Sequence, residues 1–388
     1  MATPKDRGSK LDHGERQIRI LMIPQSKDPV LARWAHRSVL DVERTPHKSS
    51  TQVETYGRAE SPASNVGKRN SNSRMNSVTA SRRLVLASPL AAESISIATE
   101  SLIGNKPVIL GLNSCEVFRN TIPPIRRMLG ASGMFNSGTN LLTRLLKENC
   151  VIPERYAHYG PKASKEKYGI RWQVPWGKHT PAMFIHDYSA PLAANMTKED
   201  ALPVVTVRNP YDWMISMCSH TYTARWSMRE RGHANICPHL VYANSTLTEL
   251  WPVGLTVKLA NQTVHFESLA HLWNEWYLQY ERDADFPFIM VRFEDLVFRQ
   301  YVTTKTICTC AGGDTKEKDE FKYIVNSAKQ GPGHGAKDEK TDMVTAWIKY
   351  GKPKKAKSGY NDLDWEASLK YVSKELMNKL GYQYPPSA

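Results

Sequence analysis

The pattern of apolar and polar positions changes at about residue 105. Beyond it, short apolar runs alternate with stretches whose apolar side chains recur on one helical face. Strand-length runs occupy residues 128–135, 170–174, 182–185, 204–207 and 288–292. The helical stripes comprise Leu141, Leu142, Leu145 and Leu146; Leu272, Trp273, Trp276 and Tyr280; and a last amphipathic stretch, 365–380. Strands that alternate with helices predict an α/β fold, a parallel sheet with helices on both faces.

Residues 1–105 show no such pattern. Of the 36 aromatic residues, only Trp34 and Tyr56 fall in this segment, and runs such as 71–81 are small and polar. Large apolar side chains supply most of the burial that offsets chain entropy. We therefore predict a disordered, basic, Ser-rich region over 1–105, followed by one folded domain over 106–388.

The net charge of +14 is spread along the chain, with +6 of it in residues 1–105. A basic surface favours anionic partners, but no Lys/Arg block resembles a nucleic-acid-binding arm, so no nucleic-acid partner is expected. No uncharged apolar stretch has the length of a membrane span, and no cysteine spacing is typical of a metal site. The six cysteines do not decide the redox compartment. Asparagines 195, 244 and 261 lie in sequons that permit glycosylation in a secretory lumen.

The segment 133–140 reads GMFNSGTN, with two glycines separated by four residues. That spacing matches the phosphate loop G-x-x-x-x-G-K-[ST], but Thr139 and Asn140 stand where that loop has its lysine and its magnesium-binding hydroxyl. A strand before the loop and a helix after it direct backbone N–H groups and the positive end of the helix dipole to one point. The sequence thus predicts an anion site without the lysine; a plain strand-to-helix turn is the alternative.

A second candidate element begins with the β-branched run 204–207. Arg208 follows that strand at its carboxyl end, where doubly wound sheets bind their ligands. Asn209 is a favoured N-cap, Pro210 suits the first helical position, and Ser216 lies about two turns further on. Arg208 and Ser216 are therefore predicted to bind a phosphate group.

Taken together, these segments resemble the sulfotransferases that use 3′-phosphoadenosine-5′-phosphosulfate (PAPS). In that family a [KR]-S-G-T-[TN] loop holds the 5′-phosphosulfate, and an Arg and a Ser eight residues apart hold the 3′-phosphate. A third family feature, a strand ending in a Tyr/Phe-Glu-Asp-Leu turn, is matched by "FIMVRFEDL", residues 288–296. The resemblance implies a P-loop type of fold, PAPS as co-substrate, no metal, and the cofactor-binding residues Asn136, Ser137, Gly138, Thr139, Asn140, Arg208 and Ser216.

Asn136 departs from the family pattern, since a basic residue normally precedes Ser-Gly-Thr. Lys178, in "WGKHTP", is our candidate to neutralise the leaving phosphate in its place, and a surface lysine is the alternative interpretation.

Removing the acceptor's proton calls for a base, and histidine has a suitable pKa. His186 has the place of the family's histidine, after the predicted strand 182–185 and 22 residues before Arg208. His179, beside Lys178, is its rival, and His158 is a weaker candidate.

The expected function is transfer of a sulfuryl group from PAPS to a hydroxyl or amine, on a carbohydrate acceptor. A P-loop nucleotide kinase is one alternative, and a non-catalytic protein that binds nucleotides or sulfated glycans is another. Family resemblance and the sequons favour the Golgi lumen over the cytoplasm. Acceptor identity and oligomeric state stay open.

Overall fold

The computed structural model describes residues 104–185, 197–226, 237–243, 250–259, 262–324 and 357–383. All of them belong to the second of two units, Ser71–Ala388; the first is Met1–Asn70. Three features considered above lie outside the described residues: the segment 1–103, His186 and the three sequon asparagines.

A five-stranded sheet forms the centre of the described part, in the order β1-β11-β5-β2-β4. Strands β11, β5, β2 and β4 run parallel to one another, whereas the edge strand β1 is antiparallel to β11. The expectation of an α/β fold is confirmed, with a sheet that is mostly rather than wholly parallel. Its strands are β1 (Ile109–Leu110), β2 (Met128–Gly133), β4 (Ile170–Arg171), β5 (Ala201–Val207) and β11 (Ile289–Arg292).

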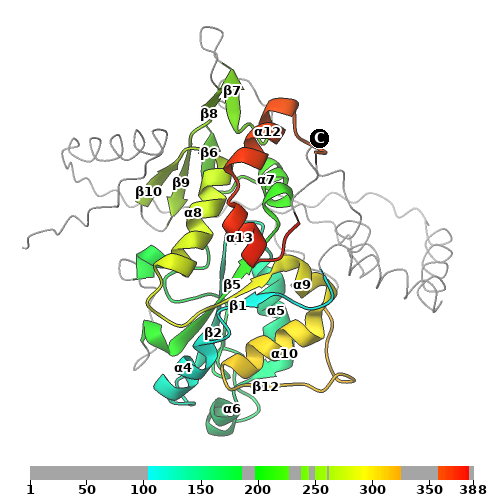
Figure 1. Cartoon of the computed structure of the whole chain (residues 1–388). Helices are drawn as coiled ribbons and strands as arrows, with labels where there is room; N and C mark the ends of the chain where they lie inside the picture. Colours follow the sequence, from blue (N-terminus) through cyan, green and yellow to red (C-terminus); the bar gives the residue numbers. More distant parts are fainter. Residues whose placement is uncertain are drawn as a thin grey trace, which may run out of the picture. The chain divides into compact units, whose positions relative to one another are not determined.

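Helices cover both faces of this sheet (Figure 1). Alternate side chains of β5 enter different cores: Leu202 and Val204 belong to one buried cluster, and Val205 and Val207 to the other. The first cluster includes residues of α4 (Ser114–Thr121), α5 (Thr139–Asn149), α9 (Phe293–Phe298) and α10 (Gln300–Cys310). The second includes residues of α7 (Pro210–Ser219), α8 (Leu269–Arg282), α12 (Asp362–Tyr371) and α13 (Lys374–Lys379).

Smaller elements surround this centre. In Figure 1 the antiparallel sheet β10-β9-β6 and the β7–β8 pair lie at the upper end, and α6 and β12 lie at the lower end. Their bounds are β3 (Cys150–Val151), α6 (Pro153–Tyr159), η1 (Ala182–Ile185), η2 (Lys198–Asp200), β6 (Ala224–Trp226), β7 (Val241–Ala243), β8 (Leu250–Pro252), β9 (Leu255–Leu259), β10 (Gln262–Phe266) and β12 (Asp314–Thr315).

The expected strand at 182–185 is wrong, because this segment is the 3₁₀ helix η1. Pro181 precedes it, and the Pro181 carbonyl accepts a hydrogen bond from the N–H of Phe184 at 3.2 Å. The fixed φ of proline suits the start of a helical turn, which buries Phe184 and Ile185 without any strand neighbour. The expected strand 170–174 is shorter than predicted, since β4 has two residues.

The last amphipathic stretch is two helices, α12 and α13, and not one. Asn274 of α8 holds the break: its amide Nδ2 donates to the Tyr371 carbonyl at 2.7 Å, and its Oδ1 accepts from the N–H of Ser373 at 2.9 Å. These bonds replace helical ones, and the Ser373 hydroxyl then caps α13.

All six cysteines are paired in disulfides, a pairing that their spacing left undecided. The bridges join Cys115 to Cys310, Cys150 to Cys308 and Cys218 to Cys237. The first two attach α4 and β3 to the same helix, α10, and cross-link segments that are 195 and 158 residues apart.

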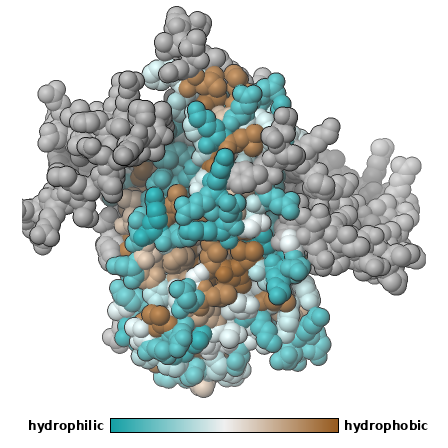
Figure 2. All heavy atoms as spheres, in the orientation of Figure 1, coloured by the Kyte–Doolittle hydropathy of each residue, from teal (hydrophilic) through white to brown (hydrophobic). Residues whose placement is uncertain are grey.

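On the face drawn in Figure 2, hydrophilic residues surround several separate hydrophobic patches. Among the residues the structure describes, we find no helix with the length and apolar character that a membrane crossing requires.

Candidate active site

The loop between β2 and α5 depends on two glycines in conformations that other residues avoid. Gly133 has a φ of 146° and Gly138 a φ of 97°. A Cβ on Gly133 would stand 2.3 Å from the hydroxyl oxygen of Thr206, and one on Gly138 would stand 2.4 Å from the ring of Phe293. Both conformation and space therefore require glycine here, which brings the loop directly against β5 and the start of α9.

Helix α5 begins at Thr139, and within the described residues no side chain caps its first turn. The first N–H groups of a helix have no intrahelical acceptor and carry the positive end of its dipole. The hydroxyl of Ser137 is buried and turned inward, donating to the Met134 carbonyl at 2.7 Å and lying 2.8 Å from the Thr206 hydroxyl. Since the Ser137 side chain is engaged elsewhere, what this loop can offer to an anion is the backbone N–H groups at the start of α5.

Gly133 also fixes the segment that carries Lys178 and His179. Its N–H donates to the Lys178 carbonyl at 2.9 Å, and its own carbonyl lies 2.6 Å from Nδ1 of His179. The indole N–H of Trp276, on α8, donates to the His179 carbonyl at 3.2 Å. Both side chains are thereby held beside the loop.

The contact with Gly133 sets the tautomer of His179. A carbonyl only accepts hydrogen bonds, so Nδ1 of His179 must be the donor. In the neutral ring the lone pair then lies on Nε2, the nitrogen that can accept a proton. The half-buried ring packs beside Phe135, with centroids 4.5 Å apart, and Phe135 in turn stacks on Tyr222 at 4.8 Å. A positioned imidazole with this tautomer can act as a general base.

Lys178 is buried, with 5% of its surface exposed, and so is not a surface lysine. Its Nζ donates to Oδ1 of Asn140 in the first turn of α5 at 3.0 Å and lies 3.3 Å from the ring centroid of Trp172. A positive charge therefore stands at the N-terminus of α5, although the sequence position that normally supplies it holds Asn136.

Arg208 reaches the loop from the carboxyl end of β5. Its guanidinium donates to the Asn136 carbonyl at 3.3 Å and lies 5.2 Å from the ring centroid of Phe293. Its own carbonyl accepts from the indole N–H of Trp273 at 3.1 Å. Only 7% of Arg208 is exposed, so its charge lies in a partly desolvated position next to the loop.

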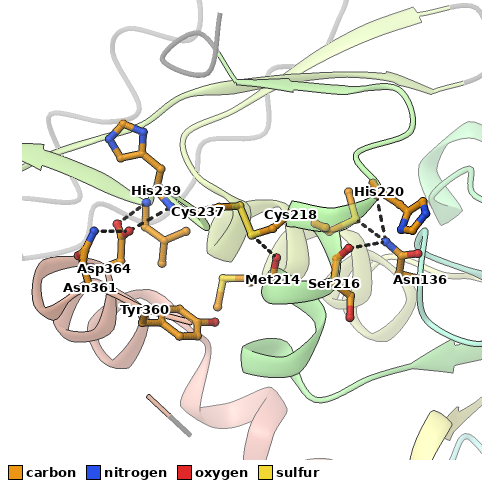
Figure 3. Close-up of a disulfide and its surroundings, with 12 residues drawn as sticks. Asn136, Met214, Ser216, Cys218, His220, Cys237, His239, Tyr360, Asn361 and Asp364 are labelled. Carbon is orange, nitrogen blue, oxygen red and sulfur yellow. Dashed lines mark hydrogen bonds between the residues drawn. A yellow bond between two sulfur atoms is a disulfide. The ribbon is translucent and has the colours of Figure 1, made fainter. Parts of the chain in front are cut away.

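Asn136 connects the loop to the end of α7 (Figure 3). Its amide Nδ2 donates to the carbonyls of Ser216 and His220, at 3.2 and 3.1 Å, while its Oδ1 accepts from the Tyr222 hydroxyl at 3.1 Å. Its φ of 60° is left-handed, a conformation that asparagine tolerates better than lysine or arginine. Asparagine at position 136, in place of a basic residue, thus has a structural role. The hydroxyl of Ser216 donates to the Asp212 carbonyl at 2.9 Å.

The turn after β11 supports the same region. The carboxylate of Glu294 accepts from the N–H of Asn209 at 3.2 Å and from the hydroxyl of Tyr382 at 2.8 Å. Asn209 is the N-cap of α7, as predicted, with its Oδ1 accepting from the N–H of Tyr211. Burial raises the pKa of Glu294, and the nearby charge of Arg208 opposes that rise without cancelling it.

The fold therefore brings together the three segments that carry the family resemblance. Of the residues singled out in the sequence, the loop 136–140, Lys178, His179, Arg208 and Ser216 lie in one connected region, as the contacts above describe. His158 lies on α6, the helix that Figure 1 draws at the lower end of the described unit, and none of the contacts above involves it. Sequence reasoning missed the supporting contacts of Phe135, Thr206, Tyr222, Trp273 and Glu294, because these depend on tertiary packing and have no motif of their own.

A surface pocket of about 340 Å³ lies elsewhere, between β3, β12 and α6, and includes Lys165, Tyr168 and Lys316. It shares no residue with the loop. The described residues contain no group of three or more His, Cys, Asp or Glu side chains that could hold a metal ion.

No protein-family model matches this chain, and neither does any curated protein or solved structure. What is known of this region therefore comes from its geometry: a glycine loop that leads into a helix N-terminus, flanked by a lysine, an arginine and an oriented histidine.

Proposed function

We propose that this protein is a sulfotransferase that moves a sulfuryl group from PAPS to a hydroxyl or amine of an acceptor, most simply a carbohydrate. The observation that carries the proposal is the convergence of Lys178, His179 and Arg208 on one uncapped helix N-terminus. The co-substrate has anionic groups at the 5′ and the 3′ positions of its ribose, and this chain offers two separate positive positions beside the loop.

PAPS would supply the sulfuryl group, which is joined through oxygen to the 5′-phosphate. The N–H groups of the loop 137–140 and the ammonium of Lys178 would bind that phosphate and stabilise the charge it gains as its S–O bond breaks. Arg208, with Ser216 at the second turn of α7, would bind the 3′-phosphate. The absence of a P-loop lysine at Thr139 suits a transfer that uses neither γ-phosphate nor magnesium.

His179 would accept the proton. As the acceptor oxygen forms its bond to sulfur, its proton passes to Nε2 of His179, and the displaced phosphate keeps the electron pair of the broken S–O bond. The carbonyl of Gly133 would stabilise the imidazolium, because Nδ1 already donates to it. His186, beyond the described residues, is the rival base.

The three disulfides support placement in an oxidising compartment such as the Golgi lumen, because cytosolic thiols are kept reduced.

The first experiment tests the nucleotide. Adenosine 3′,5′-bisphosphate should raise the melting temperature of the purified protein without magnesium, because the loop binds through N–H groups. Stabilisation by ATP with magnesium and none by the bisphosphate would favour the nucleotide kinase instead.

A second experiment tests the base with labelled PAPS and a panel of glycan acceptors. His179→Ala should abolish turnover and leave the affinity for the bisphosphate nearly unchanged, since the base acts on the acceptor. His186→Ala is the matched variant. Full activity in His179→Ala combined with loss in His186→Ala would transfer the role to His186, and activity in both variants would remove histidine from the mechanism.

A further inference from the structure

Trp172 is unusually accessible for a tryptophan next to a candidate active site. It follows β4 directly, and 44% of its surface is exposed. Its backbone carbonyl accepts from the Thr143 hydroxyl of α5 at 3.3 Å, which holds the backbone at Trp172 beside that helix. Tryptophan has a large apolar surface, so a ligand that covered the exposed part of the indole would gain binding free energy from its burial.

Positive charges accompany this indole. The ammonium of Lys178 lies 3.3 Å from its ring centroid and that of Lys147 lies 5.8 Å from it. Asn140, Arg144 and Lys147 are spaced i, i+4 and i+7 on α5, and therefore share one face of the helix.

The neighbouring acid does not neutralise this face. The carboxylate of Glu148 is paired with Nζ of Lys322 at 2.8 Å, and that contact is the main cause that lowers the pKa of Glu148. A flat aromatic surface with cations at its border suits a sugar ring bearing a negative group: the C–H face of the ring packs on the indole, and the anion meets the cations.

We propose that Trp172 is an acceptor-binding residue, on which a sugar ring that carries a carboxylate or a sulfate group packs, with Lys147 binding that group. The inference rests on the proposed function, and it narrows the acceptor to an anionic saccharide. The location fits, because Trp172 touches Lys178, the side chain assigned to the leaving phosphate, and the acceptor must approach the sulfur close to that point.

The test compares three acceptors on the full chain: a neutral oligosaccharide, one that contains uronate and one that already bears sulfate. We expect at least one of the two charged acceptors to have a kcat/KM about tenfold above that of the neutral one. Trp172→Ala should raise the KM of that charged acceptor about tenfold, while Trp172→Phe should restore most of the loss because a ring remains.

The chain offers a matched control for Trp172 and another for Lys147. Trp251, on β8, is 39% exposed, and Trp251→Ala should leave the KM unchanged. Lys147→Met should remove the preference for charged acceptors, and Lys305→Met should not, although Lys305 lies at a similar 5.6 Å from the ring of Tyr301.

Direct titration of the charged saccharides separates this inference from the proposed function. If the bisphosphate fails to bind, the sulfotransferase proposal fails, and saccharide binding to wild type and Trp172→Ala still tests the surface. Preference for the neutral acceptor, an unchanged KM in Trp172→Ala, or no binding of either charged saccharide would overturn the inference.

Discussion

Arg208 contributes a charge that the fold holds in a partly desolvated position between the loop and α9. We expect Arg208→Ala to lower the affinity for adenosine 3′,5′-bisphosphate by about tenfold to a hundredfold, because a charge-assisted pair of this kind contributes about 1.5 to 3 kcal/mol. The affinity for an analogue without the 3′-phosphate should fall much less. Calorimetric titration of both ligands into both proteins makes the comparison. Equal losses would mean that Arg208 acts through its bond to the Asn136 carbonyl alone.

The raised pKa of Glu294 leads to a prediction about how the free energy of unfolding depends on pH. Its pKa is raised by burial, so between the ordinary glutamate value and the raised value the native state holds a proton that the unfolded state releases. The free energy of unfolding therefore falls as pH rises through that window. The glutamine of Glu294→Gln does not titrate, so the melting temperature of this variant relative to wild type should increase as the pH rises above the ordinary glutamate value.

Glu375→Gln serves as the control for that measurement. Glu375 is exposed, and a hydrogen bond from Lys379 lowers its pKa, so this variant should show no such increase. A melting-temperature difference that stays constant with pH in Glu294→Gln would contradict the assignment of a raised pKa.

At the scale of elements, the end of α7 is held from two sides (Figure 3). The side chain of Asn136 binds the carbonyls of Ser216 and His220, and Cys218 between them is bonded to Cys237. Beyond Cys237, the carboxylate of Asp364 accepts from the N–H groups of residues 239–241, at distances from 2.6 to 3.3 Å. The disulfide thus connects the proposed 3′-phosphate helix to a fixed part of the chain.

Replacing Cys218 and Cys237 together by serine should therefore weaken bisphosphate binding, by about threefold to tenfold, since α7 and Asn136 lose one restraint. Replacing Cys150 and Cys308 removes a disulfide of the lower end and should lower the melting temperature without changing the affinity of the folded protein. Titration well below both melting temperatures separates the two. Unchanged affinity in the first variant would show that Asn136 alone positions α7.

Elements with a strong local signal were predictable from the sequence. Strand β5, the N-cap Asn209 and the apolar stripe of α5 follow from β-branched runs, capping chemistry and helical period, and the structure confirms them. The apolar run 182–185 was misread because four residues carry too little period to separate a strand from a 3₁₀ turn. The break in the last helix depends on Asn274, nearly 100 residues away, which no local pattern indicates.

The candidate site was predictable to a similar degree. Motif spacing selected the loop and Arg208, but it could not show that Asn136 binds α7 or that the Ser137 hydroxyl turns inward. Those outcomes depend on which carbonyls the fold places within reach of each side chain. The same holds for the tautomer of His179, which Gly133 decides.

At the scale of the whole described unit, α10 joins parts of the chain that are far apart in sequence. Cys308 and Cys310 are bonded to Cys150 and Cys115, so both ends of the stretch 151–307 are anchored covalently to one helix. That stretch contains the strands β4, β5 and β11 and the residues Lys178, His179 and Arg208, whereas β2 and the loop 136–140 precede it.

A protease that cut this chain once, anywhere between residues 151 and 307, would therefore not release a fragment. The two pieces would stay joined by two disulfide bonds, or by three if the cut fell between Cys218 and Cys237, and the buried clusters on both faces of the sheet would still hold them together. Such a nicked molecule would migrate as one band on a non-reducing gel and as two bands only after reduction.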